Sequence, residues 1–125
     1  MKNRIIIDLD GTLTIHRAGE YENAAPNELV ISKLHIFKKL VYEIVLFSAR
    51  NMRKYEGNIG LINIHTLPII INWLKKNDVP YDEVIVGKLW CGNYGYYVDD
   101  RAVRPDEFAK LTPDQISGLV NTKHQ

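Results

Sequence analysis

Four short stretches, each with three or four consecutive apolar residues, divide the chain, at residues 4–9, 44–47, 83–87 and 96–100. Apolar runs of this length without polar alternation are typical of strands that are covered on both faces of a parallel sheet. The first run is the clearest, because it contains three consecutive β-branched isoleucines, a residue type enriched in strands. We therefore predict a strand at each of the four runs.

Between these runs the apolar positions change to helical spacing. Pro26 is predicted to open a helix, because a proline at the first helical position loses no hydrogen bond. A second helix is predicted over residues 67–76, where two lysines suit the helix end and Pro80 bars continuation. The residues expected to face the sheet are Val30, Leu34, Phe37 and Val41 in the first helix, and Leu67, Ile70, Ile71 and Leu74 in the second.

Three stretches lack both patterns. Residues 51–65 are predicted to form a long loop with room for one turn of helix, and long loops in small domains are usually functional. Residues 89–95 are too few for the helix that normally joins parallel strands, so we predict a non-helical crossover there. The sequence TPDQ at residues 112–115 is a capping-box pattern, which predicts a short helix that ends near Val120.

The alternation of strands and helices indicates an α/β fold, a small Rossmann-like, mainly parallel sheet with helices on both faces. A chain of 125 residues is long enough for one core. We predict one domain over residues 1–125, with its core in 4–104 and a helical tail in 105–125. The gaps at residues 13–26 and 51–65 are too short to hold an additional cap domain.

Composition and charge limit the partners and the cellular compartment that we expect for the protein. The net charge is +1, from 16 basic and 15 acidic residues, so nothing favours nucleic acid or an anionic membrane surface as a partner. A single cysteine, Cys91, excludes an internal disulfide and fits a reducing compartment. The basic start is followed by too few apolar residues for a signal peptide or a membrane span. We therefore predict a cytoplasmic protein that binds neither nucleic acid nor membranes.

Polar residues gather where the predicted strands end, which is where α/β sheets bind their ligands. Asp8 and Asp10 are two positions apart, so their side chains point to the same face and can share one pocket. Two close carboxylates repel each other unless a cation lies between them. The full set is Asp8, Asp10, Gly11 and Thr12 after the first strand, Ser48 and Arg50 after the second, Lys88 after the third, and Asp99 and Asp100 in the fourth.

These residue types suit a site for magnesium and phosphate. Mg²⁺ prefers oxygen ligands, one or two of them carboxylates, with water and substrate phosphate in the remaining positions. Asp99 would bring a further carboxylate to the same edge of the sheet. Lys88 and Ser48 would hold phosphoryl oxygens, and free backbone N–H groups at Gly11 and Thr12 would bind others.

The motifs Asp8-x-Asp10-Gly11-Thr12, Ser48, Lys88 and Asp99-Asp100 resemble, in the same order, the four motifs of the haloacid dehalogenase-like (HAD) superfamily of phosphohydrolases. The resemblance spans residues 4–104. In addition, the stretch NMRKYEGNIGLINIHTLP resembles a small capless branch of that superfamily that is encoded with capsule or lipopolysaccharide biosynthesis functions. The chain departs from the pattern at residues 89–95, where relatives usually have a helix.

The resemblance implies a role for each acidic residue. Asp8 would attack phosphorus and become an aspartyl-phosphate, and Asp10 would protonate the leaving alcohol and then activate water. Mg²⁺ would be held by Asp8, the backbone carbonyl of Asp10, and Asp99. Asp100 would lie behind the metal ligands, because adjacent strand residues face opposite ways. The resemblance further implies a homo-oligomer whose substrate is a small phosphorylated molecule, a sugar phosphate of surface-polysaccharide synthesis.

Two alternatives stay open. A receiver domain of a two-component system also has a phosphorylated aspartate and a lysine on an α/β sheet. In receivers the lysine comes last, whereas Asp99 and Asp100 follow Lys88 here, which favours a hydrolase over a receiver-like phosphoacceptor or a binding module without turnover. Arg50 fits a contact with substrate phosphate and a structural ion pair equally well.

Overall fold

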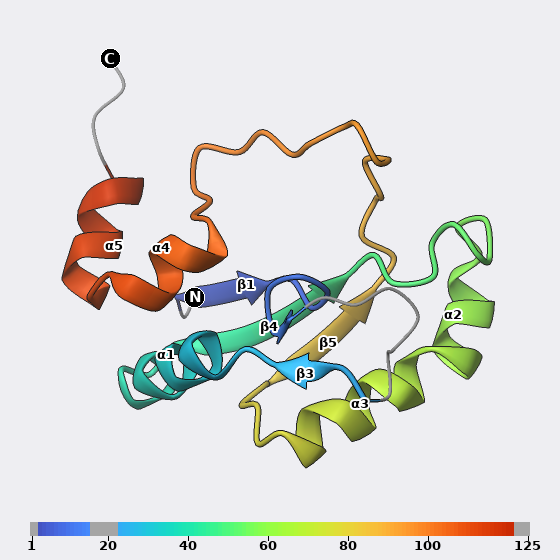
Figure 1. Cartoon of the computed structure of the whole chain (residues 1–125), viewed down its shortest axis with the longest axis horizontal. Coiled ribbons are helices and arrows are strands. Elements are labelled where there is room, and N and C mark those ends of the chain that lie inside the picture. The colour runs from blue at the N-terminus through green and yellow to red at the C-terminus, as the bar shows by residue number, and fades with distance from the viewer. Residues whose placement is uncertain (1–2, 16–22, 122–125) are drawn as a thin grey trace. The chain divides into compact units, whose positions relative to one another are not determined.

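The computed structural model describes residues 3–15 and 23–121 and forms two compact units, Met1–Trp90 and Cys91–Gln125. The first unit is an α/β fold around a three-stranded parallel sheet in the order β1-β4-β5 (Figure 1). Its strands are β1 (Arg4–Ile7), β4 (Glu43–Ser48) and β5 (Glu83–Val86). The first three predicted strands and their parallel pairing are therefore confirmed.

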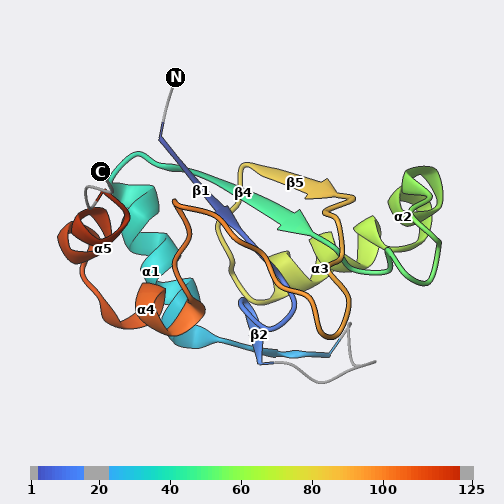
Figure 2. The same ribbon diagram turned by 90° about the horizontal axis from the view of Figure 1, so that it is seen from above.

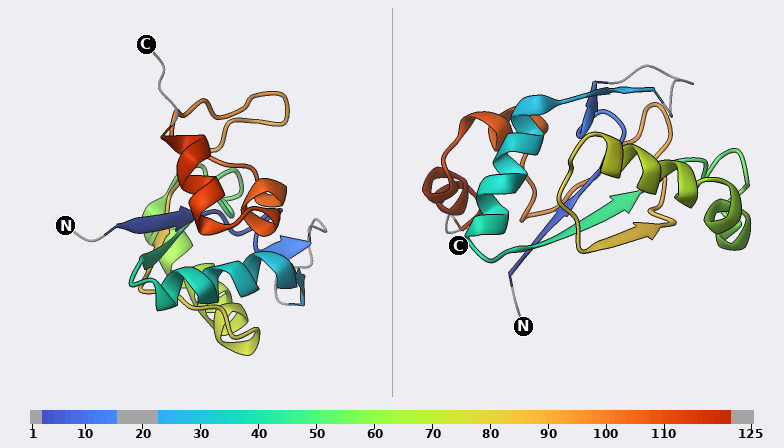
Figure 3. Two further views of the ribbon diagram at one scale, coloured as in Figure 1. Left: turned by 90° about the vertical axis from the view of Figure 1, so that its left-hand side faces the viewer. Right: turned by 90° about the horizontal axis from the view of Figure 1, so that it is seen from below.

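Helices α1 (Glu28–Lys39) and α3 (Leu67–Lys76) cover the same face of this sheet (Figures 2 and 3). Each connection moves one strand further in the same direction, and right-handed connections then place both helices on one side. The prediction of helices on both faces is therefore wrong for this unit. Its buried core includes Ile7, Ile44 and Leu46 from the strands, and Val30, Leu34, Phe37, Ile70 and Leu74 from the helices.

Helix α1 begins two residues later than predicted. Pro26 belongs to β3 (Ala25–Pro26), which pairs antiparallel with β2 (Thr14–Ile15). Asn27 caps the helix instead, because its Oδ1 accepts a hydrogen bond from the Val30 N–H at 3.4 Å. The sequence predicts that residues 13–26 hold no cap domain, and residues 16–22 of this segment lie outside the described residues.

The predicted buried stripe of α1 holds except at its end. Val41 lies beyond the helix, has a φ of 66° and is 68% exposed. A positive φ is unfavourable for a β-branched residue, so this turn is set by the return of the chain into β4 and not by the preference of valine.

Helix α3 has the predicted bounds, and its stripe is partly confirmed. Its buried side chains are Ile70, Trp73 and Leu74, whereas Leu67 and Ile71 are half-buried. Residues 51–65 contain a longer helix than the predicted single turn, α2 (Ile59–His65), which lies beyond the carboxyl ends of β4 and β5 (Figure 1). Asn58 caps α2, because its Oδ1 accepts a hydrogen bond from the Leu61 N–H at 3.1 Å.

The second unit contains helices α4 (Pro105–Lys110) and α5 (Pro113–Val120). The predicted capping box of α5 is confirmed: Thr112 Oγ1 accepts from the Gln115 N–H at 3.1 Å, and Gln115 Oε1 accepts from the Thr112 N–H at 2.9 Å. Helix α4 lies within the predicted helical tail of residues 105–125, although its own bounds were not predicted. None of the helices in the described ranges is long and apolar enough to cross a bilayer.

Residues 89–100 form neither helix nor strand. The prediction of a non-helical stretch over 89–95 is confirmed, whereas the predicted strand over 96–100 is wrong. A strand is stable only when its backbone pairs with another strand, and residues 91–121 of the second unit contain none. The apolar side chains of the stretch are exposed, Tyr96 by 80% and Val98 by 89%.

Candidate active site

The turn after β1 carries Asp8 and Asp10. The Leu9 carbonyl accepts hydrogen bonds from the N–H groups of residues 12–14, at 3.2, 2.9 and 3.1 Å. The Leu9 side chain is fully buried, so the turn is anchored in the core between the two aspartates. Gly11 has a φ of +82°, a conformation that glycine adopts without steric cost.

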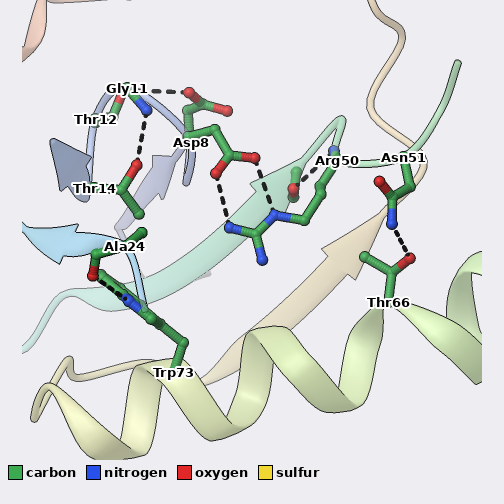
Figure 4. Close-up of polar contacts among 11 residues, drawn as sticks. Asp8, Gly11, Thr12, Thr14, Ala24, Arg50, Asn51, Thr66 and Trp73 are labelled. Carbon is green, nitrogen blue, oxygen red and sulfur yellow. Dashed lines mark hydrogen bonds and ion pairs between the residues drawn. The ribbon is translucent and has the colours of Figure 1, made fainter. Parts of the chain in front are cut away.

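Two side chains hold the end of β4 in one conformation (Figure 4). Ser48 Oγ accepts a hydrogen bond from the Arg50 N–H at 3.0 Å. Asn51 has a φ of 63°, which asparagine tolerates better than most residues, and its Nδ2 donates to Thr66 Oγ1 at 2.7 Å. Thr66 is buried where α2 ends and α3 begins. Arg50 therefore lies between two fixed points of the chain.

Arg50 forms a bidentate ion pair with Asp10, whose side chain carries no label in Figure 4. Its Nε donates to Asp10 Oδ2 at 3.1 Å, and its Nη2 donates to Asp10 Oδ1 at 2.7 Å. The Arg50 side chain is 1% exposed and that of Asp10 is 27% exposed. The sequence leaves two roles open for Arg50, a structural ion pair and a contact with substrate phosphate. The structure shows the ion pair, and the phosphate contact stays a prediction.

Lys88 approaches Asp8 from the end of β5. Its Nζ lies 3.7 Å from Asp8 Oδ1, and Thr12 Oγ1 donates a hydrogen bond to Asp8 Oδ2 at 3.3 Å. The Lys88 N–H donates to the Ser48 carbonyl at 3.1 Å, which ties the residue to the end of β4. Gly87 is required at the preceding position, because its φ is +92° and a Cβ there would lie 2.5 Å from a side-chain carbon of α2.

Burial raises the pKa of the Asp8 carboxyl above its ordinary value of 3.8. Asp10 raises this pKa further, whereas the positive charge of Lys88, the Leu9 N–H and the Thr12 hydroxyl lower it. The raised pKa means that burial outweighs the charge that Lys88 supplies. A further cation beside Asp8 would favour its ionised form.

This raised pKa predicts a pH-dependent effect of Asp8→Asn on stability without metal. The native state of the wild type binds the Asp8 proton more tightly than the unfolded state does. Its free energy of unfolding therefore falls as pH rises from 3.8 through the raised native pKa. Asparagine does not titrate, so the variant should become more stable than the wild type across that window and stay so at neutral pH. Urea unfolding in chelator, at a series of pH values, measures the difference; a variant that loses relative stability as pH rises would contradict the pKa direction.

The structure brings the predicted residues of the first unit together at the ends of β1, β4 and β5. Asp8 contacts Lys88 and Thr12, and Asp10 contacts Arg50. The predicted cluster is thus present for the part of the site that residues 1–90 supply.

The predicted phosphate-binding groups are used within the protein. The expectation of free N–H groups at Gly11 and Thr12 is wrong in this structure, because the Gly11 N–H donates to Thr14 Oγ1 at 3.1 Å and the Thr12 N–H donates to the Leu9 carbonyl. Ser48 is buried and its hydroxyl caps the turn at Arg50. Contacts of these groups with phosphate stay predictions.

Asp99 and Asp100 belong to the second unit. Asp99 Oδ1 accepts a hydrogen bond from the Arg101 N–H at 2.8 Å, as in a local turn. Because residues 96–100 form no strand, the alternation of strand side chains no longer ranks Asp99 above Asp100 as a metal ligand. Both assignments stay predictions.

The donors of the first unit suit magnesium in part. Within residues 3–15 and 23–90, no three His, Cys, Asp or Glu side chains form a cluster that could hold a metal ion. Mg²⁺ needs only one or two carboxylates and keeps several waters or substrate oxygens. Asp8 can supply one carboxylate. The Asp10 carboxylate is bound to Arg50, and the Asp10 backbone carbonyl stays a predicted metal ligand.

Two buried hydroxyls organise the site and were not among the predicted site residues. Thr14 is 2% exposed and accepts from Gly11, and Thr66 is 1% exposed and accepts from Asn51. Each has at least one apolar neighbour in the sequence, and a hydroxyl is buried at low cost only if it is hydrogen-bonded. That signal identifies a bonded threonine but not its partner.

Comparison with solved structures found a relative of this chain. The protein belongs to the same family as a structural-genomics target from Vibrio cholerae whose crystal structure is known: the two chains are 56% identical and superpose with a TM-score of 0.93, over 96% of this chain and 97% of that one. No family model matches the sequence, and no curated protein matches it.

Proposed function

We propose that this protein is a phosphomonoester hydrolase of the HAD type, which requires Mg²⁺ and forms an aspartyl-phosphate on Asp8. One arrangement carries the proposal. At the carboxyl ends of three parallel strands, the Asp8 carboxylate lies beside the Lys88 ammonium and the Thr12 hydroxyl, with the Asp10–Arg50 pair next to it. A carboxylate nucleophile, a second carboxylate for proton transfer and a cation for phosphate are the groups that this reaction needs.

The reaction has two steps. In the first, an Asp8 carboxylate oxygen bonds to phosphorus, the bond from phosphorus to the leaving oxygen breaks, and Asp10 donates a proton to that oxygen. In the second, Asp10 takes a proton from water as the water oxygen bonds to phosphorus. The bond between phosphorus and Asp8 breaks, which releases inorganic phosphate and restores the carboxylate.

Positive charge is needed at both steps. Lys88 lowers the pKa of Asp8 and so favours the ionised nucleophile, and its position 3.7 Å from Oδ1 places it beside the transferred phosphoryl group. Mg²⁺, held by Asp8 and the Asp10 backbone carbonyl, would neutralise charge on the phosphoryl oxygens. Asp99, in the second unit, is a further ligand that only the resemblance to the superfamily implies.

The substrate that we favour is a sugar phosphate of surface-polysaccharide synthesis. Its support is the resemblance of residues 51–68 to the capless branch of the superfamily. The described residues between β4 and α3 hold only the short helix α2, so no cap domain is inserted there. An open site of this kind suits a homo-oligomer in which a neighbouring subunit covers the substrate, and the lone cysteine suits the cytoplasm.

The test is the release of phosphate by the wild type. Steady turnover of 4-nitrophenyl phosphate with Mg²⁺, lost in chelator and restored by added Mg²⁺, is the expected result. A panel of sugar, nucleotide and amino-acid phosphates then ranks the substrates by kcat/KM. Incorporation of one phosphate on Asp8 without turnover would contradict the proposal and support a receiver-like phosphoacceptor.

A further inference from the structure

Arg50 is built into the site in a way that the proposed reaction does not yet explain. Its guanidinium comes from the end of β4 and contacts both carboxylate oxygens of Asp10, 40 residues earlier in the chain, at 3.1 and 2.7 Å. Bidentate contacts of arginine with carboxylate fix orientation as well as charge, since the planar fork matches the two oxygens.

The burial of Arg50 distinguishes it from a residue that contacts substrate directly. The Arg50 side chain is 1% exposed, whereas Asp10 is 27% exposed and Lys88 is 23% exposed. A ligand that enters from solvent therefore reaches Asp10 and Lys88 before it reaches Arg50. The guanidinium supports the carboxylate from the protein side.

The backbone around Arg50 is fixed as well. Its N–H is bound to Ser48 Oγ, and the next residue, Asn51, is tied to the buried Thr66 at the start of α3. A side chain on such a backbone has little freedom to leave its partner. The position of Asp10 is thus linked through Arg50 to β4 and α3.

We infer that Arg50 is a positioning residue, which holds the Asp10 carboxylate in the orientation for proton transfer to the leaving group; this inference rests on the proposed function. An ionised carboxylate has about four lone-pair sites, and the bidentate contact uses two of them. The other sites remain for the proton that Asp10 gives to the leaving oxygen and later takes from water.

The test compares two substrates of nearly equal shape and different leaving groups. Phenol is a much poorer leaving group than 4-nitrophenol, so phenyl phosphate depends more on the proton from Asp10 than 4-nitrophenyl phosphate does. The quantity measured is kcat/KM with Mg²⁺, which reports phosphoryl transfer to Asp8. The ratio of kcat/KM for the two substrates does not depend on the folded fraction of the protein, so it can be interpreted even for a partly unfolded variant.

In Arg50→Gln we expect kcat/KM for phenyl phosphate to fall about 10- to 100-fold, a part of the usual effect of a general acid. The loss for 4-nitrophenyl phosphate should be several times smaller. Arg50→Lys should restore little of the kcat/KM for phenyl phosphate, because an ammonium cannot make the bidentate contact. Asp10→Asn should change the ratio in the same direction, and the double variant should change it no further. Arg53→Gln, an exposed arginine nearby, is the matched control and should leave both values unchanged.

Equal losses on both substrates in Arg50→Gln would overturn the inference and leave the proposed function intact. A raised KM with unchanged kcat and ratio would also overturn it, in favour of a direct phosphate contact. If the wild type turns over neither ester, the proposed function and the inference fall together.

Discussion

Asp8→Asn is expected to abolish phosphate release, with a fall in kcat of about 10⁴-fold or more, as when the nucleophile of other covalent hydrolases is removed. The amide is nearly the same size as the carboxylate, so packing in the turn after β1 is kept. A neutral amide oxygen is a poor nucleophile, however, and the aspartyl-phosphate cannot form. Initial rates at saturating 4-nitrophenyl phosphate and Mg²⁺ measure the loss. Acid quench with labelled substrate should trap phosphate on the wild type and none on the variant.

The matched control for this change is Asp78→Asn. Asp78 is 96% exposed and has a φ of 54°, which asparagine adopts at least as readily. The control should keep the activity of the wild type. If Asp8→Asn retains more than about a tenth of the wild-type rate, a mechanism through an aspartyl-phosphate on Asp8 is wrong, since the remaining groups alone cannot sustain it.

The largest expected effect on stability is that of Trp73→Ala, a loss of about 3–5 kcal/mol in the free energy of unfolding. Trp73 is 2% exposed in α3, and its Nε1 donates to the Ala24 carbonyl at 2.8 Å (Figure 4). Truncation leaves a large cavity in the core and also removes the partner of a buried carbonyl. Urea unfolding followed by far-ultraviolet circular dichroism is the measurement, because the change removes a fluorophore.

The other tryptophan of the chain provides the control. Trp90 is 44% exposed, so Trp90→Ala should cost only about 0.5 kcal/mol. Trp73→Phe separates the two causes, since it keeps most of the volume and loses only the hydrogen bond to Ala24. A loss of under about 1 kcal/mol in Trp73→Ala would show that α3 does not depend on this side chain.

Elements whose signals are local could be predicted from the sequence. The bounds of α3 and the capping box at Thr112 follow from residues within four positions of one another, and both are confirmed. The three parallel strands follow from continuous apolar runs. Since the carboxyl ends of such strands meet at one edge, Asp8 and Lys88 could be placed together without knowledge of the fold.

Elements that depend on distant partners could not be predicted. Pro26 suits the start of a helix, but pairing with Thr14 draws it into β3. Residues 96–100 were predicted as a strand, yet residues 91–121, the described part of the second unit, contain no strand for them to pair with. Helices on both faces were expected from the alternation of strands and helices, whereas the strand order decides the side on which each helix packs.

The sequence by itself determined the chemistry that the site can hold: two carboxylates on one turn and a lysine shortly after a strand. The tertiary structure alone decided how those groups meet. It pairs the buried Arg50 with Asp10 and raises the pKa of Asp8 through burial. Residue types and spacing are local properties of a chain, whereas burial and ion pairing depend on which distant segments fold against one another.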